Sequence, residues 1–133
     1  MATQARPPAP DSPATDARAP TPPIVAPFAG SAYRFADRNP WQRTPEGYWV
    51  KPLYEDKALG ERTLLMRIEP GTVSRPHAHE GELEQIYMVE GTFQDQSGVL
   101  RAGDYACRAP GSIHSGRTDT GCVMLLIYSR KQP

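Results

Sequence analysis

Large apolar residues are distributed unevenly along the chain, and their pattern predicts strands rather than helices. Short runs rich in Val, Ile, Leu, Tyr and Trp recur at intervals of about 8–12 residues, with Gly and Pro turn signals between them. The predicted strands span residues 47–54, 62–69, 85–90, 104–108 and 122–128. No window of about 12 residues carries the apolar stripe of an amphipathic helix. The pattern therefore predicts an all-β domain, either a sandwich or a barrel.

The first 29 residues lack this pattern and form a segment rich in proline and alanine. They hold eight of the 15 prolines, and their only large apolar residues besides Met1 are Ile24, Val25 and Phe28. So few apolar groups do not offset the cost of ordering a backbone, roughly 1–2 kcal/mol per residue. We predict a disordered tail over residues 1–29 and one domain over residues 30–133. The alternative is that residues 22–25 dock at the domain edge.

Charge and composition exclude several classes of protein. The 133 residues carry 15 basic and 15 acidic side chains, so no positive excess points to nucleic acid. No apolar run approaches the roughly 20 residues of a membrane span, and none suits a signal peptide. Two cysteines are too few for a disulfide scaffold or a four-thiolate zinc site. We expect a cytoplasmic protein that binds neither nucleic acid nor membrane.

Two of the predicted strands, residues 85–89 and 122–128, are apolar on both faces. A strand of this kind is covered on both sides, by a second sheet or by a second subunit. A domain of about 100 residues has little spare chain for the second cover, so we predict a homodimer. The competing expectation is that residues 24–35 fold over this surface.

All three histidines of the chain lie beside Gly/Pro turns that border predicted strands. On a strand, the spacing of His77 and His79 puts both imidazoles on one face. Glu84 opens the next apolar run after a turn, and His114 follows a later turn. Imidazole and carboxylate groups bind transition metals. These four residues therefore predict a metal site, with a surface His-x-His pair that binds nothing as the alternative.

The spacing of these residues resembles the two sequence motifs of the cupins. The first motif is matched at every interval by Gly71, His77, His79, Glu84 and Gly91. The second is matched by Gly103, Gly111 and His114, with Ala109 where the family has Pro and Thr118 where it has Asn. Neither departure removes a metal ligand.

Further short matches between about Trp41 and Arg130 narrow the resemblance to the ChrR-type cupins. They include the segments 90–98, 102–105 and 110–114. This group contains the C-terminal half of the anti-sigma factor ChrR and relatives of an acetylacetone-cleaving dioxygenase. The resemblance implies a double-stranded β-helix, a jelly-roll barrel, which frequently forms a dimer.

The same resemblance implies one divalent transition metal, Fe²⁺ or Zn²⁺, held by His77, His79, Glu84 and His114. The dioxygenase holds iron with three histidines only, so Glu84 is either a fourth ligand or a group hydrogen-bonded to the ligands. The implied function is a mononuclear non-haem dioxygenase that cleaves a small dicarbonyl-like substrate. Isomerase-type chemistry, in which the metal only polarises a carbonyl, is a further possibility.

The main alternative function is a zinc-holding cupin that senses a ligand and regulates a partner without catalysis. An anti-sigma factor grips its partner with a helical zinc domain, and the tail carries neither helices nor His/Cys ligands for one. We therefore do not expect a sigma partner.

Glu84 and Tyr105 are the candidate catalytic residues. Glu84 qualifies by its place beside the predicted ligands. Tyr105 offers a phenol to bound substrate, with a packed core tyrosine as the alternative. Cys107 is expected as a small buried apolar residue, or else as a thiol that faces the metal.

Overall fold

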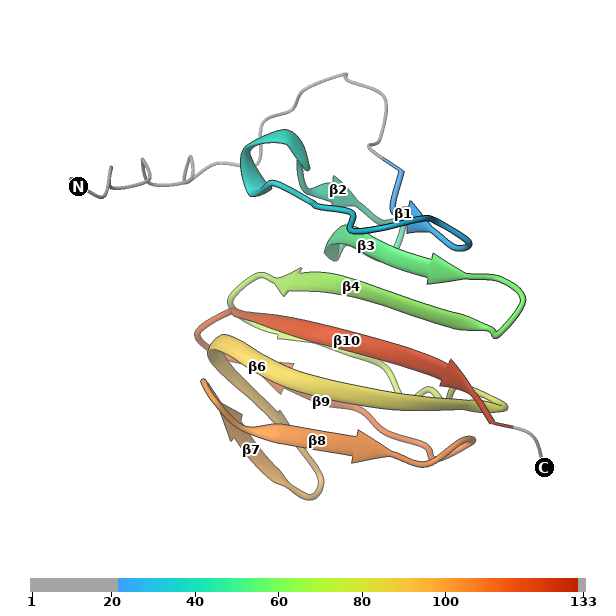
Figure 1. Ribbon diagram of the computed structural model, residues 1–133. Coiled ribbons are helices and arrows are strands. Elements are labelled where there is room, and N and C mark those ends of the chain that lie inside the picture. The colour runs from blue at the N-terminus through green and yellow to red at the C-terminus, as the bar shows by residue number, and fades with distance from the viewer. Residues whose placement is uncertain (1–21, 132–133) are drawn as a thin grey trace.

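A computed structural model describes residues 22–131, and the elements within this range are almost all strands (Figure 1). They are β1 (Ile24–Val25), the 3-10 helix η1 (Ala36–Arg38), β2 (Gln42–Arg43), β3 (Trp49–Asp56), β4 (Glu61–Ile68), β5 (Thr72–Val73), β6 (Glu82–Asp95), β7 (Gly98–Arg101), β8 (Tyr105–Arg108), β9 (Gly116–Thr118) and β10 (Cys122–Arg130). The all-β prediction is confirmed, and each of the five predicted strands has its counterpart. Within the described range, η1 is far too short to cross a membrane.

The strands form a two-layered jelly roll in which β6 belongs to both layers. The larger sheet has the order β1-β3-β4-β10-β6-β8, and β2 also pairs with β3. The smaller sheet is made by β5, β9, β7 and the second half of β6. β10 lies at the centre of the larger sheet, where Leu126 pairs with Leu64 on one side and Ile86 on the other.

The long strand β6 passes from one layer to the other at Gly91. The sequence predicts a turn there, but the strand continues through a kink. Gly91 has φ +75°, and a side chain at this position would collide with the backbone of Gly121. The register of β10 against β6 shifts beside it, between Val123 and Met124. The glycine therefore turns one strand into a corner of the barrel instead of ending it.

The apolar core lies between the two layers. Successive residues of a strand point to opposite faces, and the larger sheet therefore has an inner and an outer face. The inner face presents Ile86, Met88, Met124 and Leu126, which pack with Phe93 of the smaller sheet.

The outer face of the larger sheet presents Tyr87, Val89 and Tyr105, and their side chains are about half exposed. Cys107 of β8 is exposed as well. No second layer of the described chain covers these residues. Within one chain, the larger sheet is therefore covered on its inner face only, and not on both faces as expected. Cys107 is exposed and is not the buried residue that the sequence predicted.

The N-terminal segment pairs with the edge of the larger sheet. Ile24 and Val25 form a parallel ladder with β3, Ala26 donates a hydrogen bond from its backbone to Glu55 (2.9 Å), and the Phe28 ring packs on Tyr54. Of residues 22–25, Ile24 and Val25 thus dock at the domain edge, so the predicted tail 1–29 contains a paired strand. These contacts are with β3, not with β10. The expectation for residues 1–21 lies outside the described residues.

Candidate metal centre

Two irregular segments lie side by side and carry the three histidines. His77 and His114 form an antiparallel bridge, because each backbone N–H donates to the other's carbonyl oxygen at 2.9 Å. Ser74 and Gly116 extend the pairing, and the Gly111 N–H donates to the carbonyl oxygen of His79 (3.0 Å). The sequence predicted His77 and His79 on a strand; the structure has a single bridge there, which is enough to fix the neighbouring imidazoles.

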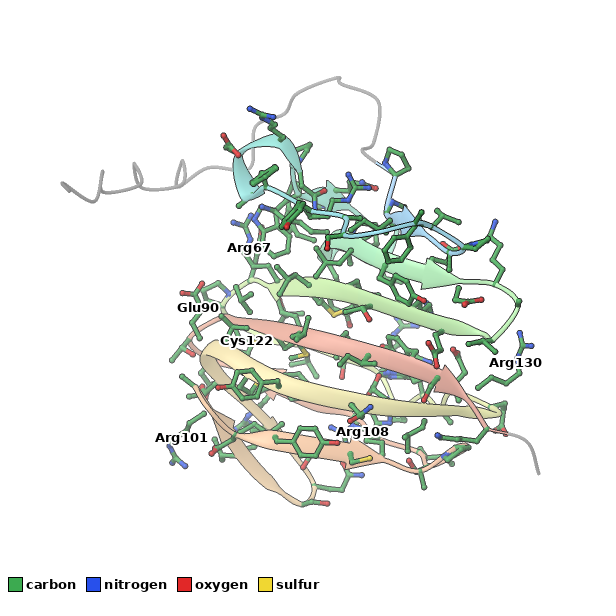
Figure 2. The ribbon with its side chains drawn as sticks, in the orientation of Figure 1. Arg67, Glu90, Arg101, Arg108, Cys122 and Arg130 are labelled. Atoms are coloured by element: carbon green, nitrogen blue, oxygen red, sulfur yellow. The ribbon has the colours of Figure 1, made fainter. Side chains whose placement is uncertain are left out.

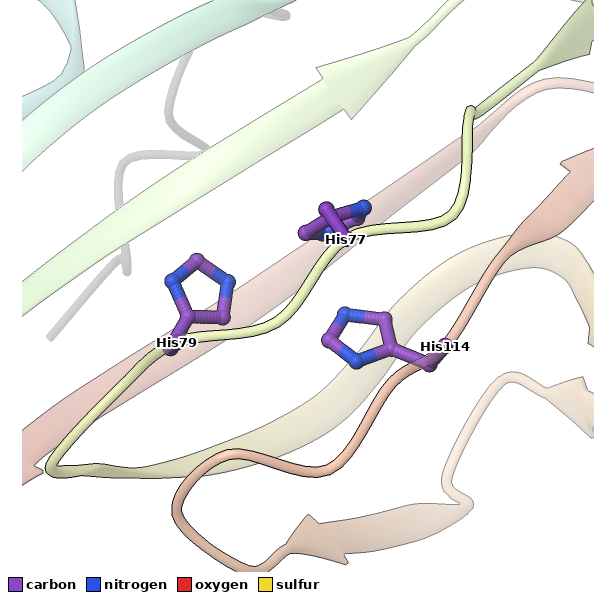
Figure 3. A group of neighbouring side chains, drawn as sticks. All are labelled: His77, His79 and His114. Carbon is purple, nitrogen blue, oxygen red and sulfur yellow. The ribbon is translucent and has the colours of Figure 1, made fainter.

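The three imidazoles converge on one point (Figure 3). One ring nitrogen from each of His77, His79 and His114 lies within 4.8 Å of the other two. The ring of His77 lies 4.2 Å from that of His114 and 5.4 Å from that of His79, measured between centroids. His114 is buried, His79 is half-buried and His77 is exposed, so the cluster lies where the interior opens to solvent.

Backbone carbonyl groups orient two of the three rings. Nδ1 of His77 lies 2.9 Å from the carbonyl oxygen of Arg75, and Nδ1 of His114 lies 3.2 Å from that of Ser112. A proton on each Nδ1 makes these contacts hydrogen bonds and leaves Nε2 with a free lone pair. This arrangement is usual for histidines that bind a metal. The donor set therefore fits a transition metal such as iron or zinc.

Burial and charge favour the neutral form of His114. Desolvation lowers the pKa of this imidazole, and the positive charge of Arg108 lowers the same pKa further. A neutral imidazole is the form that binds a metal.

Glu84 lies on the inner face of β6, beside the histidines. Its carboxylate Oε2 lies 3.2 Å from Nε2 of His79, and its Oε1 lies 3.7 Å from Nε2 of His114. The residue is 4% exposed. Glu84 is not part of the set of mutually close donors, which contains only the three histidines. The geometry is compatible with both roles considered from the sequence, a fourth ligand or a partner of the ligands.

Arg108 and Asp95 also belong to this site, although no sequence pattern singled them out. Nε of Arg108 lies 3.2 Å from Oε1 of Glu84, and its second guanidinium nitrogen lies 2.8 Å from Oδ2 of Asp95. Burial raises the pKa of Asp95, but the hydrogen bond and charge of Arg108, together with hydrogen bonds from the backbone N–H groups of Ser97 and Gly98, outweigh it and lower the pKa below its usual value. Figure 2 shows Arg108 within the outline of the sheet, whereas Arg101 and Arg130 lie at its margins.

Tyr128, the last residue of the apolar run 122–128, also lies at the site. Its ring lies 4.9 Å from that of His79, and the Arg62 guanidinium lies 4.1 Å from its centroid. Burial raises the pKa of the phenol, and the negative charge of Glu84 raises the pKa further. Tyr128 thus stays protonated. Its position opposite Glu84 in the β10–β6 ladder is the signal that could have identified it.

Tyr105 does not belong to this site, which corrects the sequence prediction. Ala106 and Arg108 are the residues of β8 that face inward, so Tyr105 and Cys107 face outward. The Tyr105 hydroxyl donates to Oε1 of Gln85 on the outer face (2.7 Å). The sheet therefore separates this phenol from the histidines.

A cavity of about 220 Å³ opens beside the histidines. Its polar lining contains the three histidines with Glu84, Arg108, Tyr128 and Ser74, and Thr44, Glu46 and Tyr48 line it as well. The opposite wall is apolar and is built by Met66, Ile68, Ile86, Phe93, Met124 and Leu126. The arrangement can hold a metal ion next to a small, largely apolar molecule.

A jelly roll with histidines converging on such a cavity defines a cupin, and comparison with protein families specifies which kind. The chain belongs to the family described as the ChrR Cupin-like domain, whose model matches residues 30–131. The resemblance inferred from the sequence motifs is therefore confirmed. A search of curated proteins finds no match.

Solved structures of other cupins share the fold. An RmlC-like cupin from Ralstonia eutropha JMP134 has a TM-score of 0.68 at 19% identity, over 76% of this chain and 69% of that one. An acetylacetone dioxygenase from Acinetobacter johnsonii has a TM-score of 0.66 at 16% identity, over 77% and 75%. The anti-sigma factor ChrR from Rhodobacter sphaeroides, solved with SigE, has a TM-score of 0.59 at 20% identity, over 74% of this chain and 52% of the matched chain.

Proposed function

We propose that the protein is a mononuclear, metal-dependent dioxygenase that cleaves a small dicarbonyl-like substrate. The observation that carries the proposal is the convergence of three imidazoles, two of them anchored through Nδ1, on a largely apolar cavity. In this proposal His77, His79 and His114 hold one divalent transition metal, which is Fe²⁺, and Glu84 lies beside them.

When bound, the metal supplies a Lewis acid that polarises a carbonyl group and, as iron, the redox chemistry that a dioxygenase needs. The protein's own residues bind and orient the substrate. The apolar wall, with Met124 and Leu126, favours a neutral molecule and excludes water from its carbon chain. The guanidinium of Arg108 holds the Glu84 carboxylate at the polar wall.

The test is purification without added metal and without oxygen, followed by metal analysis and loading with Fe²⁺. Oxygen uptake is then measured against a panel of small diketones and hydroxy-ketones. We expect uptake with at least one neutral diketone, loss of that uptake in His114→Ala, and retention in the outer-face control Gln85→Ala. Tight iron binding with no uptake for any member of the panel would contradict the dioxygenase proposal.

A second candidate function is a zinc-holding cupin that senses a small ligand and regulates a partner. The match to the ChrR Cupin-like domain favours it, as does the structural similarity to an anti-sigma factor, although this chain spans about half the length of that relative. This candidate predicts stoichiometric zinc in the purified protein and stabilisation by a ligand that is not consumed. Mass spectrometry of the ligand after incubation separates the two functions.

We further propose that two copies pair through the outer face of the larger sheet. Tyr87, Val89 and Tyr105 are half exposed there, next to Leu125, and the N-terminal segment lies on β3 instead of covering them. An apolar face of this kind is self-complementary about a two-fold axis. Sedimentation at micromolar concentration should give twice the chain mass of 14.7 kDa, and Tyr87→Lys should give the monomer. A wild-type monomer would contradict the pairing.

A further inference from the structure

A row of three charged side chains runs through the interior beside the histidines. Asp95, Arg108 and Glu84 have side chains that are 9%, 11% and 6% exposed, respectively. The two carboxylates lie near opposite ends of β6, and Arg108 of β8 lies between them. Buried charges persist only when they are paired, so the position of each of the three depends on the others.

Arg108 forms an ion pair with Oε1 of Glu84, one of the two oxygens with which this carboxylate could bind a metal. Nε of Arg108 lies 3.2 Å from Oε1 of Glu84. Nη2 of the same guanidinium group lies 2.8 Å from Oδ2 of Asp95, which fixes its position. A guanidinium group keeps its charge at every accessible pH, so it does not release the carboxylate by losing a proton. The Nε–H group is not aligned on Oε1 as a hydrogen bond, so the contact is an ion pair.

The contact between Glu84 and His79 does not by itself decide the role of the carboxylate. A separation of 3.2 Å between Oε2 and Nε2 suits two donors on one ion as well as two groups in direct contact. The arginine decides it, because a carboxylate shared with a fixed cation is a weaker metal donor.

We propose that Arg108, itself held by Asp95, is a positioning residue that keeps the Glu84 carboxylate out of the metal's coordination sphere. The resident metal then has three histidine ligands, and Glu84 is a latent fourth ligand that binds only when Arg108 is removed. This inference rests on the metal site proposed above. It concerns residues of this chain, because the cupin motif alone would assign Glu84 to the metal.

The test uses Co²⁺ as a probe, because its visible absorption reports the number and type of its ligands. Co²⁺ is added to the wild-type protein, to Glu84→Gln, to Arg108→Gln and to the double variant, and the spectra and affinities are compared. We expect Glu84→Gln to leave the band positions unchanged, with a loss of affinity no larger than the roughly 10–100-fold that removal of a supporting group costs.

Arg108→Gln should bind Co²⁺ at least about tenfold more tightly, with weaker absorption as the coordination number rises. The double variant should return to the wild-type spectrum. This comparison separates ligation by Glu84 from the simple loss of a repelling positive charge, which the double variant shares. The exposed Arg117→Gln, which carries the same chemical change on an arginine paired with Asp119 instead of Glu84, is the matched control.

Two outcomes would overturn the inference, and they are distinguishable. Wild-type protein that binds no Co²⁺ would overturn the metal site and the role of Arg108 with it. Normal binding by the wild type with a changed spectrum in Glu84→Gln would overturn the role of Arg108 alone, because Glu84 would then already be a ligand. The Glu84→Gln comparison decides the matter even if Arg108→Gln does not fold.

Discussion

Alternate residues of β6 build the two faces of the larger sheet, and these faces differ in chemistry. On the inner face, Glu84, Ile86 and Met88 are at most 4% exposed. On the outer face, Tyr87 and Val89 are 48% and 47% exposed. The even-numbered residues of this part of β6 thus face the interior and its cavity, whereas the odd-numbered residues face away from it.

The comparison shows how differently polar groups are constrained on the two faces. Glu84 on the inner face is fixed by Arg108, which is fixed in turn by Asp95, because an unpaired charge there would cost several kcal/mol. In a single chain, the outer-face bond between Tyr105 and Gln85 lies within reach of water, which can replace either partner. Substitutions should therefore have large effects on the inner face and small effects on the outer face.

The largest expected effect is the loss of the metal on removal of a histidine. His77→Ala or His114→Ala removes one of three converging donors, and the affinity for Zn²⁺ or Fe²⁺ should fall by on the order of 100-fold or more. Metal content after gel filtration, measured by elemental analysis, checks this. Gln85→Ala on the outer face is the control and should keep a full complement. Full metal content in both histidine variants would refute the assignment.

The second largest expected effect is on stability, and it differs between two adjacent leucines of β10 that point to opposite faces. Leu126 is 2% exposed on the inner face, whereas Leu125 is only half-buried on the outer face. Leu126→Ala should lower the free energy of unfolding by about 3 kcal/mol, and Leu125→Ala by about 1 kcal/mol. Urea denaturation of the two variants, at a concentration low enough for the protein to be monomeric, measures the difference. Equal losses in the monomer would show that its outer face is as well packed as its inner face.

Strand parity allowed much of this organisation to be predicted from the sequence. Alternation along residues 122–128 assigned Leu126 and Tyr128 to one face, and the cupin spacing identified the histidines. Arg108 and Asp95 were missed because their pairing depends on the ladder between β8 and β6 and on the kink at Gly91, neither of which a local pattern encodes.

Two further predictions were wrong for physical reasons that apply to single residues. Tyr105 was assigned to the site because a tyrosine at a barrel strand suits either face, and only the register Tyr87–Tyr105 shows that it faces outward. The tail was predicted to be disordered through residue 29 because two strand residues carry little signal. Ile24 and Val25 are ordered by the free edge of β3, which is a feature of the fold and not of the segment.

A smaller effect is the dependence of stability on pH through Asp95 of the inner charge row. Because its pKa in the folded protein lies below 3.8, its contribution is complete above pH 3.8 and is lost as the pH falls through the lower folded value. Asp95→Asn should cost about 2 kcal/mol near pH 6, and the difference from wild type should shrink below pH 3.8. Unfolding by urea at several pH values measures it; a difference independent of pH would contradict the role of the ion pair.

The smallest effect concerns β1, which belongs to neither face but closes the edge of the sheet. Residues 1–21 contain no large apolar residue besides Met1, so their deletion should leave the melting temperature unchanged. Deletion of residues 1–29 also removes the pairing of Ile24 and Val25 with β3 and the contact between Phe28 and Tyr54. The hydrogen bonds of so short a strand barely exceed the cost of ordering it, so the loss should be about 1 kcal/mol, a few degrees in melting temperature. Calorimetry of the two truncated proteins distinguishes them. Identical melting temperatures would mean that β1 only shields the free edge of β3 without stabilising the fold.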